Sequence, residues 1–248
     1  MTDAIQQQPQ PPHQSQLAAG PVRRFFTGLW RNWIMPFAIA AAVLAPIRSA
    51  IADWYDVPTG SMEPTILIGD RITANKLAYG LRVPFTDRWV ARWADPARGE
   101  IVILHSPAGG TRLVKRVIGV PGDTITMIEN CLSINGAEVT STALSAGEVS
   151  AIDATLRATG QFITEHLPGQ DHTVMLTPRR HAATRTFGPV TVPAGHYLVM
   201  GDNRDNSADS RIFGFVPQGS IVGRSSAVAI SLDSSWPPRW GRFFTALR

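Results

Sequence analysis

Residues 124–140 read TITMIENCLSINGAEVT, and this stretch indicates the fold class. It contains three short runs of apolar or alternating residues, at 124–128, 131–134 and 137–140. Asn135 and Gly136 separate the last two runs, and both residue types accept the positive φ angles of a two-residue hairpin turn. The stretch therefore predicts consecutive antiparallel strands.

The same pattern of short strands continues on both sides of this stretch. With 19 prolines and 21 glycines among 248 residues, the apolar runs are often interrupted, which favours short strands over long helices. Further strands are predicted at residues 71–77, 100–104, 112–119, 173–176, 196–200 and 225–232. We therefore expect residues 53–248 to form a mainly β domain, an antiparallel barrel-like or sandwich-like fold.

The segment before this domain has a different composition. Residues 1–28 include a run rich in Gln, Pro and Ala and predict a disordered tail. Residues 33–47 carry no charge, and residues 29–52 predict a single transmembrane helix, because 20 residues at about 1.5 Å each span roughly the core of a bilayer. Two alternatives stay open: a buried core helix, and a cleavable signal ending at Ala50, Ile51 and Ala52.

Charge and cysteine content limit the partners and the covalent chemistry. Lys and Arg outnumber Asp and Glu by 23 to 19, and no basic stripe crosses the middle of the chain. This argues against a nucleic-acid partner and for a lipid bilayer, with the N terminus in the cytoplasm because arginines precede the apolar run. The single cysteine, Cys131, excludes an intramolecular disulfide, and its apolar neighbours predict a buried thiol.

Two further segments are less specific. Residues 141–188 are polar and lack hydrophobic periodicity up to Thr173, which predicts a surface insertion with a short helix near 146–157. A lid is the alternative interpretation. Residues 236–244 mix aromatic and basic side chains, which suits either a membrane interface or a packed terminus.

A candidate nucleophile lies in residues 58–64, PTGSMEP. Two prolines and one glycine within seven residues predict a rigid turn that holds Ser61 at a fixed angle. A serine on such a turn can act as a nucleophile when a base is nearby. The turn is not a G-x-S-x-G elbow, so an ordinary loop serine is the competing interpretation.

A candidate base lies in the predicted strand at residues 112–118. None of the six histidines lies in a recognisable catalytic setting. Alternation along the strand places Leu113, Lys115 and Val117 on one face, and apolar neighbours that remove water lower the pKa of an ammonium group. An edge-strand lysine that reaches solvent is the competing interpretation.

A polar loop, residues 201–211, follows the predicted strand at 196–200. A calcium loop fails in both registers, since Arg204 takes a ligand position in one and Ser210 takes the glycine position in the other. The loop predicts a hydrogen-bond network around an active site, with a solvated surface loop as the alternative.

Together these segments resemble type I signal peptidases, the enzymes that remove signal peptides from exported proteins. The matching motifs follow the order of the family and cover much of residues 57–125 and 195–223. They are residues 61–65, 69–76, 79–84, 98–102, 115–123 and 201–211.

The resemblance implies a serine endopeptidase with Ser61 as nucleophile and Lys115 as general base. It implies that Ser207 orients the lysine amine, and that Thr59 and the Ser61 backbone N–H bind the oxyanion. The residues that it implies as electrostatic supports are Asp209, Arg211, Arg116 and Asp202.

The resemblance also implies cleavage of preproteins after small residues at the −3 and −1 positions, through an acyl-enzyme and without a metal or organic cofactor. The substrate would bind as an added strand, and the enzyme would sit in the bacterial inner membrane with its active site on the exported face. Alternatives are a conjugation-pilus or other serine–lysine processing peptidase, and a non-catalytic membrane-tethered binding domain. The candidates for shallow apolar substrate pockets are Val57, Met62, Ile66, Leu113 and Val114.

Overall fold

The computed structural model describes residues 29–86, 88–178, 183–232 and 237–247. The tail predicted over residues 1–28 lies outside these ranges. The chain divides into two compact units, Met1–Ala45 and Pro46–Arg248, and each is considered by itself.

The described part of the chain begins with a helical run. A π-helical turn, Trp30–Ile34, leads directly into α2, Met35–Ala50. The large apolar side chains of residues 30–44 in this run are exposed, with Trp33 73% and Phe37 81% accessible. The transmembrane segment predicted over 29–52 falls on this run. No helix among the described residues is both long and apolar enough to cross a membrane.

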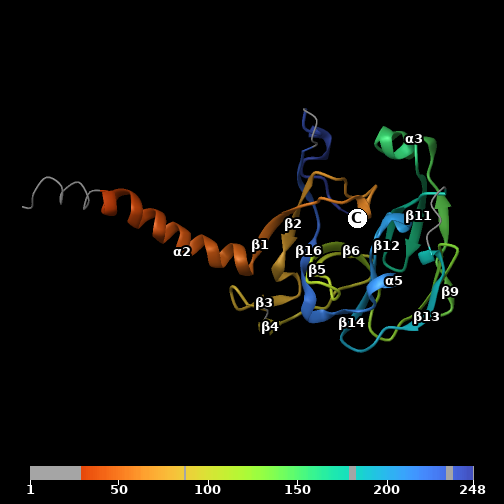
Figure 1. Ribbon diagram of the computed structural model, residues 1–248, viewed down its shortest axis with the longest axis horizontal. Coiled ribbons are helices and arrows are strands. Elements are labelled where there is room, and N and C mark those ends of the chain that lie inside the picture. Colours follow the sequence, from red (N-terminus) through yellow and green to blue (C-terminus); the bar gives the residue numbers. More distant parts are fainter. Residues whose placement is uncertain (1–28, 87, 179–182, 233–236, 248) are drawn as a thin grey trace, which may run out of the picture. The chain divides into compact units, whose positions relative to one another are not determined.

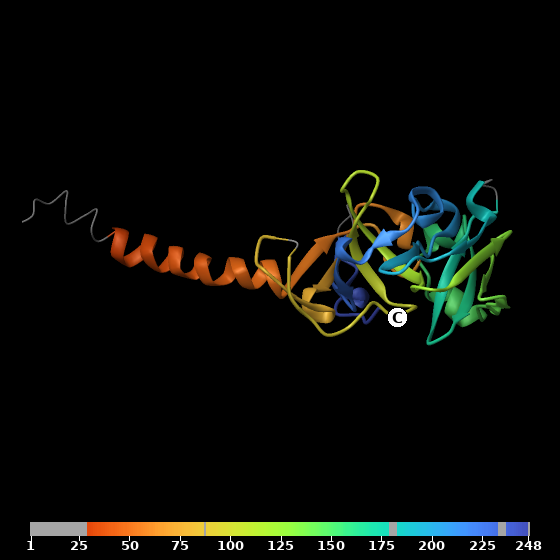
Figure 2. The same cartoon turned by 90° about the horizontal axis from the view of Figure 1, so that it is seen from below.

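The second unit is built around one eight-stranded antiparallel sheet (Figures 1 and 2). Its strand order is β1-β2-β16-β5-β6-β14-β15, and β17 also pairs with β2. The strands are β1 Ala52–Asp56, β2 Asp70–Asn75, β5 Ile101–His105, β6 Arg112–Gly119, β14 His196–Met200, β15 Val216–Pro217, β16 Ile221–Ser225 and β17 Val228–Ser231.

Three smaller antiparallel sheets complete the strands. One has the order β13-β7-β8-β9, one β10-β11-β12, and one pairs β3 with β4. Their bounds are β3 Gly80–Arg82, β4 Trp89–Arg92, β7 Thr124–Ile128, β8 Cys131–Ile134, β9 Ala137–Glu138, β10 Ser141–Ala143, β11 Gln161–Leu167, β12 Gln170–Leu176 and β13 Phe187–Thr191. The short helices are α3 Ala146–Ala151, α4 Ala154–Arg157 and α5 Ser210–Phe213.

The predicted mainly β, antiparallel character is confirmed. Strands β6, β7, β8 and β14 have the predicted bounds, and the predicted hairpin turn forms with φ of 54° at Asn135 and 81° at Gly136. The prediction for Cys131 was wrong: its side chain is exposed. Alternation along β8 turns Leu132 and Ile134 inward, so Cys131 faces outward with Ser133.

The polar stretch at 141–188 is more ordered than the sequence suggested. Helices α3 and α4 lie where a short helix was predicted, and a capping box at Ser145 and Glu148 begins α3. The same stretch also supplies β10, β11 and β12, which pair with one another. Two of its ionisable side chains, Glu165 and His172, are buried. It is therefore not only a surface insertion.

The core consists of three apolar clusters. One lies between β6, β14 and the sheet of β7 and β8, and a second between β5, β6 and β14. The third contains Val57, Met62, Ile66, Ile72 and Ile103 and packs beneath the turn that carries Ser61. This third cluster fixes the turn from below.

Candidate active site

Ser61 and Lys115 meet in the folded chain. Ser61 lies in a 3-10 turn, Gly60–Met62, that follows β1, and Lys115 lies in the middle of β6. The distance from Lys115 Nζ to Ser61 Oγ is 2.6 Å, with the ammonium group donating. A separation of this size allows direct proton transfer between the two groups.

The environment of Lys115 favours the neutral amine. The residue is 2% exposed, and the structure shows no ion pair to it from any described residue. Burial lowers the pKa of Lys115 from 10.5 to about 8, against the opposing charges of Asp209 and Asp202. A lysine with such a pKa is partly deprotonated at neutral to mildly alkaline pH and can accept a proton.

The loop at 201–207 packs directly against the turn at Gly60–Met62, which we call the serine turn. The Asn203 N–H donates to Ser61 O at 3.2 Å, and Asn203 Nδ2 donates to Gly60 O at 3.0 Å. Gly201 has no room for a side chain, because a Cβ there would lie 2.3 Å from Ser61 O and 2.4 Å from Ser207 Oγ. Neither Asn203 nor Gly201 was predicted as a site residue, although both lie in the motif at residues 201–211.

A second set of contacts holds the segment that follows the serine turn, residues 65–70. The Leu67 N–H donates to Asp70 Oδ2 at 2.9 Å, and Arg242 Nη2 donates to the same oxygen at 2.6 Å and to Thr65 O at 3.0 Å. Asp70 is fully buried. Arg242 thus packs the C-terminal segment against residues 65–70. Phe244, two residues after Arg242, is 80% exposed.

Arg116, the neighbour of Lys115 on β6, pairs with Asp202. Arg116 Nε and Nη2 each donate to one Asp202 oxygen at 2.8 Å, and Thr65 Oγ1 donates to Oδ2 at 2.6 Å. Both members of the pair are at most 1% exposed. Burial alone raises the pKa of the Asp202 carboxyl, but Arg116 outweighs it and holds that pKa below 3.8. The pair is therefore fully charged.

The polar stretch reaches this pair from the other side. Arg204 donates to both oxygens of Glu165, at 2.8 and 2.5 Å. His172 Nε2 lies 3.4 Å from Glu165 Oε2 and 4.0 Å from Asp202 Oδ1, and burial lowers the pKa of His172 to about 4. We call these five residues, Arg116, Asp202, His172, Glu165 and Arg204, the buried network.

Asp209 and Arg211 form a second ion pair. Arg211 Nη2 and Nε donate to the two Asp209 oxygens at 2.7 and 2.8 Å, and the Gly201 N–H donates to Asp209 at 3.0 Å. Burial raises the pKa of the Asp209 carboxyl, but Arg211 outweighs this effect and lowers it. The pair fixes the end of the loop that lies against the serine turn.

The structure does not show the predicted hydrogen bond between Ser207 and Lys115. Ser207 Oγ is buried and has no hydrogen-bond partner of ordinary geometry among the described residues, although it lies near enough to Asp209 to help lower the pKa of that carboxyl. Close packing on Gly201 keeps Ser207 beside the serine turn. Its orienting role remains a prediction.

A cavity of about 460 Å³ opens above Ser61 and Lys115. Thr59 lines it, is exposed, and makes no side-chain hydrogen bond to the helical turn that it precedes. Four of the five predicted pocket residues line the cavity: Val57, Met62, Leu113 and Val114. Ile66 does not line it, because its side chain lies fully buried in the third core cluster.

The family model and the similar sequences agree on one family. A family model described as "Signal peptidase, peptidase S26" matches residues 30–230. The chain is 35% identical over 207 residues to signal peptidase I of Pseudomonas fluorescens, covering 79% of this chain and 69% of that protein. It is 33% identical over 203 residues to signal peptidase I P of Bacillus subtilis subsp. natto, covering 82% and 90%. A crystal structure of a signal peptidase I from Enterococcus faecalis matches 53% of this chain and 97% of its own, at 34% identity and a TM-score of 0.32.

Proposed function

This chain belongs to the peptidase S26 family of signal peptidases, and we propose that it removes signal peptides from exported preproteins with Ser61 as nucleophile and Lys115 as general base. The resemblance inferred from the motifs is thereby confirmed, and members of this family are serine peptidases. The observation that carries the catalytic assignment is the 2.6 Å contact between Lys115 Nζ and Ser61 Oγ in a cavity that buries the lysine.

Acylation begins with the neutral form of Lys115. Its amine takes the Ser61 hydroxyl proton as Oγ bonds to the carbonyl carbon of the scissile peptide. The negative charge that develops on the carbonyl oxygen accepts hydrogen bonds from the Ser61 N–H and the Thr59 hydroxyl. The Lys115 ammonium then gives its proton to the leaving amine, so that the mature protein departs and an acyl-enzyme remains.

Deacylation uses the same base a second time. Lys115, neutral again, takes a proton from a water molecule as that water attacks the ester carbonyl. The proton returns to Ser61 Oγ as the ester bond breaks and the signal peptide is released. In this proposal Ser207 and the pairs Arg116–Asp202 and Asp209–Arg211 position the reacting groups and do not exchange protons with substrate.

The substrate would bind along β6. One edge of β6 pairs with β5. Along the other edge, β14 pairs only with Arg116 to Gly119, and no described strand pairs with residues 112–115. An extended peptide can add there by main-chain hydrogen bonds. The apolar lining supplied by Val57, Leu113 and Val114 supports small side chains at the −3 and −1 positions.

We place this reaction at the bacterial plasma membrane, with residues 1–28 in the cytoplasm and the peptidase domain, residues 53–248, on the exported face. The support is the helical run from Trp30 to Ala50, in which the large apolar side chains of residues 30–44 are exposed, together with the arginines that precede it in the sequence. Carbonate washing of membranes from expressing cells tests this placement. Release of the intact protein by carbonate would contradict it.

Cleavage of a preprotein by the detergent-solubilised full chain tests the function. A preprotein with alanine at −3 and −1 should be cut after the −1 residue by the wild type and by the control Ser133→Ala, whose serine lies on β8 away from the cavity. Ser61→Ala should not cut it, and phenylalanine at −1 should prevent cleavage by the wild type. Cleavage by Ser61→Ala at the wild-type rate would contradict the assignment of the nucleophile.

A further inference from the structure

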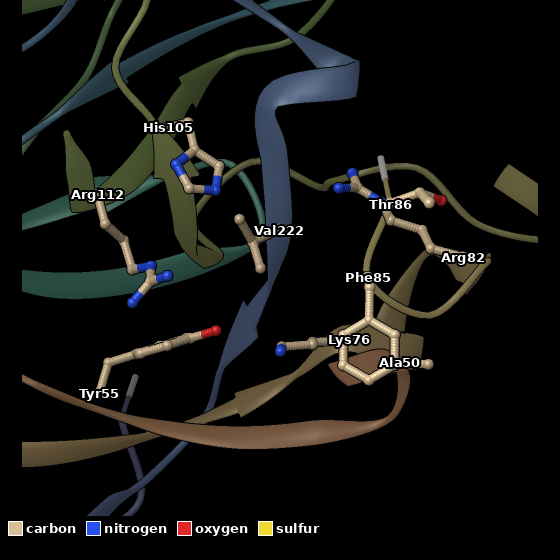
Figure 3. A pocket seen from close by; sticks show the side chains of 9 residues that line it. All are labelled: Ala50, Tyr55, Lys76, Arg82, Phe85, Thr86, His105, Arg112 and Val222. Carbon is tan, nitrogen blue, oxygen red and sulfur yellow. The ribbon is translucent and has the colours of Figure 1, made fainter. Parts of the chain in front are cut away.

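The cavity above Ser61 ends at a stack of two side chains, Tyr55 from β1 and Arg112 from β6 (Figure 3). The Arg112 guanidinium group lies over the Tyr55 ring, 4.0 Å from the ring centroid. Both residues also line a neighbouring cavity of about 340 Å³, whose lining contains neither Ser61 nor Lys115. The stack therefore lies where the two cavities adjoin, at the end of the substrate cavity away from the reacting groups.

The direction of the substrate, which rests on the proposed function, follows from the open edge of β6. This edge covers residues 112–115, because β14 pairs with β6 from Arg116 onward. Lys115 contacts Ser61, so the scissile bond lies at the Lys115 end of the open edge. The residues before the cut are the ones that enter the cavity, and they can add to β6 only along the remaining open residues. The signal peptide therefore runs from Arg112 toward Lys115.

The floor of the cavity repeats at two-residue intervals along both strands. Val57 belongs to the third core cluster, and Tyr55 and Val114 pack against that cluster. Side chains alternate between the two faces of a strand, so Tyr55, two residues before Val57, shares its face. For the same reason Arg112, two residues before Val114, shares the face of that valine. An extended peptide advances at the same spacing, so a −3 side chain above the two valines places the −5 side chain above the stack.

The charge at this level comes from Arg112, which is exposed. Within the described part of the chain, its guanidinium group makes no hydrogen bond or ion pair and contacts only the face of Tyr55. Stacking occupies a face of the planar group and leaves the N–H donors at its edge, where they can bind two oxygens of one carboxylate. Asp56, which also lines the cavity, is paired with Arg71. The stack therefore suits an acidic partner.

We propose that Arg112, oriented by Tyr55, is a specificity residue that selects an acidic side chain at the −5 position of the signal peptide. Arg112 contacts the substrate, and Tyr55 is a positioning residue that acts through Arg112. The pair adds a preference for charge at −5 to the preference for small side chains at −3 and −1. Because Arg112 is exposed, the effect is moderate and is screened by salt.

Cleavage of three matched preproteins by the detergent-solubilised full chain tests the proposal. Each carries alanine at −3 and −1, with Glu, Gln or Lys at −5. We expect the wild-type kcat/KM to fall in the order Glu, Gln, Lys, by about threefold at each step and by less at high salt. Arg112→Glu should reverse this order, and Arg112→Gln should remove most of it. The matched control Arg157→Glu changes an exposed charge on α4 outside the cavity lining and should keep the wild-type order.

The same three preproteins test the positioning role of Tyr55. Tyr55→Phe keeps the aromatic ring and should keep the ratio of kcat/KM between the Glu and Lys preproteins. Tyr55→Leu removes the ring face that orients the guanidinium group and should reduce this ratio about twofold. An unchanged ratio in Tyr55→Leu would contradict the positioning role.

Three results would overturn the selection at −5. If the wild type cuts all three preproteins with equal kcat/KM, Arg112 does not select the −5 side chain, and the proposed function stands because cleavage continues. If Arg112→Glu keeps the wild-type order, another group produces the preference. If the wild type cuts none of the three, the proposed function fails and the selection at −5 fails with it.

Discussion

Two neighbouring basic residues of β6 differ in whether a carboxylate pairs with them. Lys115 faces the cavity above Ser61 and pairs with no carboxylate of the described residues, whereas Arg116 lies in the buried network and pairs with Asp202 through two hydrogen bonds. Both are at most 2% exposed. Burial without a countercharge lowers the pKa and produces a base, and burial with a countercharge holds the charge and produces a rigid support.

The largest effect is expected when the unpaired cation is removed. Lys115→Met should lower kcat/KM for a preprotein at least about 10³-fold, because the serine loses the group that accepts its proton. The substitution also removes the cost of burying an unpaired charge, so the free energy of unfolding at pH 7 should not fall. A variant that loses both activity and stability would show that Lys115 contributes to the fold in the way that Arg116 does.

For the paired cation, Arg116, the expected effect is on stability. Asp202→Asn leaves the Arg116 charge buried without its countercharge, which should reduce the free energy of unfolding by about 3–5 kcal/mol. Urea denaturation measures this. The double substitution Arg116→Met with Asp202→Leu should recover most of the loss, and Asp171→Asn, at a side chain that is 63% exposed, is the matched control. Stability of Asp202→Asn equal to that of the wild type would contradict the account of the buried network.

The two regions should also differ in how pH affects stability. The pKa of Lys115 is about 8 in the folded chain and 10.5 without burial, so the unfolded chain binds more protons between these values. Stability of the wild type relative to Lys115→Met should therefore rise with pH across this window, by about 3 kcal/mol in total. Denaturation at several pH values from 7 to above 10.5 checks this, and a constant difference would contradict the depressed pKa.

The smallest of these effects concerns Thr59, which lines the cavity without a fixed hydrogen bond. Thr59→Val keeps the shape and removes the hydroxyl, so kcat should fall about 10²-fold with little change in KM. Thr59→Ser restores the donor and should retain most of the activity. If valine is as active as threonine, another group must stabilise the oxyanion.

The sequence predicted the elements that depend on residues close together in the chain. Alternation gave the bounds of β6, a short apolar run gave those of β14, and the motif order brought Ser61 and Lys115 together as a pair. The buried network was only partly predicted. Glu165 and His172 come from a stretch without clear periodicity, and their partners depend on how that stretch folds against the loop at 201–211. The contact of Asp70 with Arg242 joins residues 172 positions apart, which no local pattern reveals.

The most direct test of the comparison is the titration of Lys115 itself. The chain contains two lysines, Lys76 and Lys115, so full-length protein labelled with ¹³C at lysine Cε gives two NMR signals, and Lys76→Gln assigns them. We expect the Lys115 signal to titrate near pH 8 and kcat/KM for a preprotein to rise with pH through the same midpoint. A Lys115 midpoint at the ordinary lysine value of about 10.4, or a flat pH profile of kcat/KM, would contradict it.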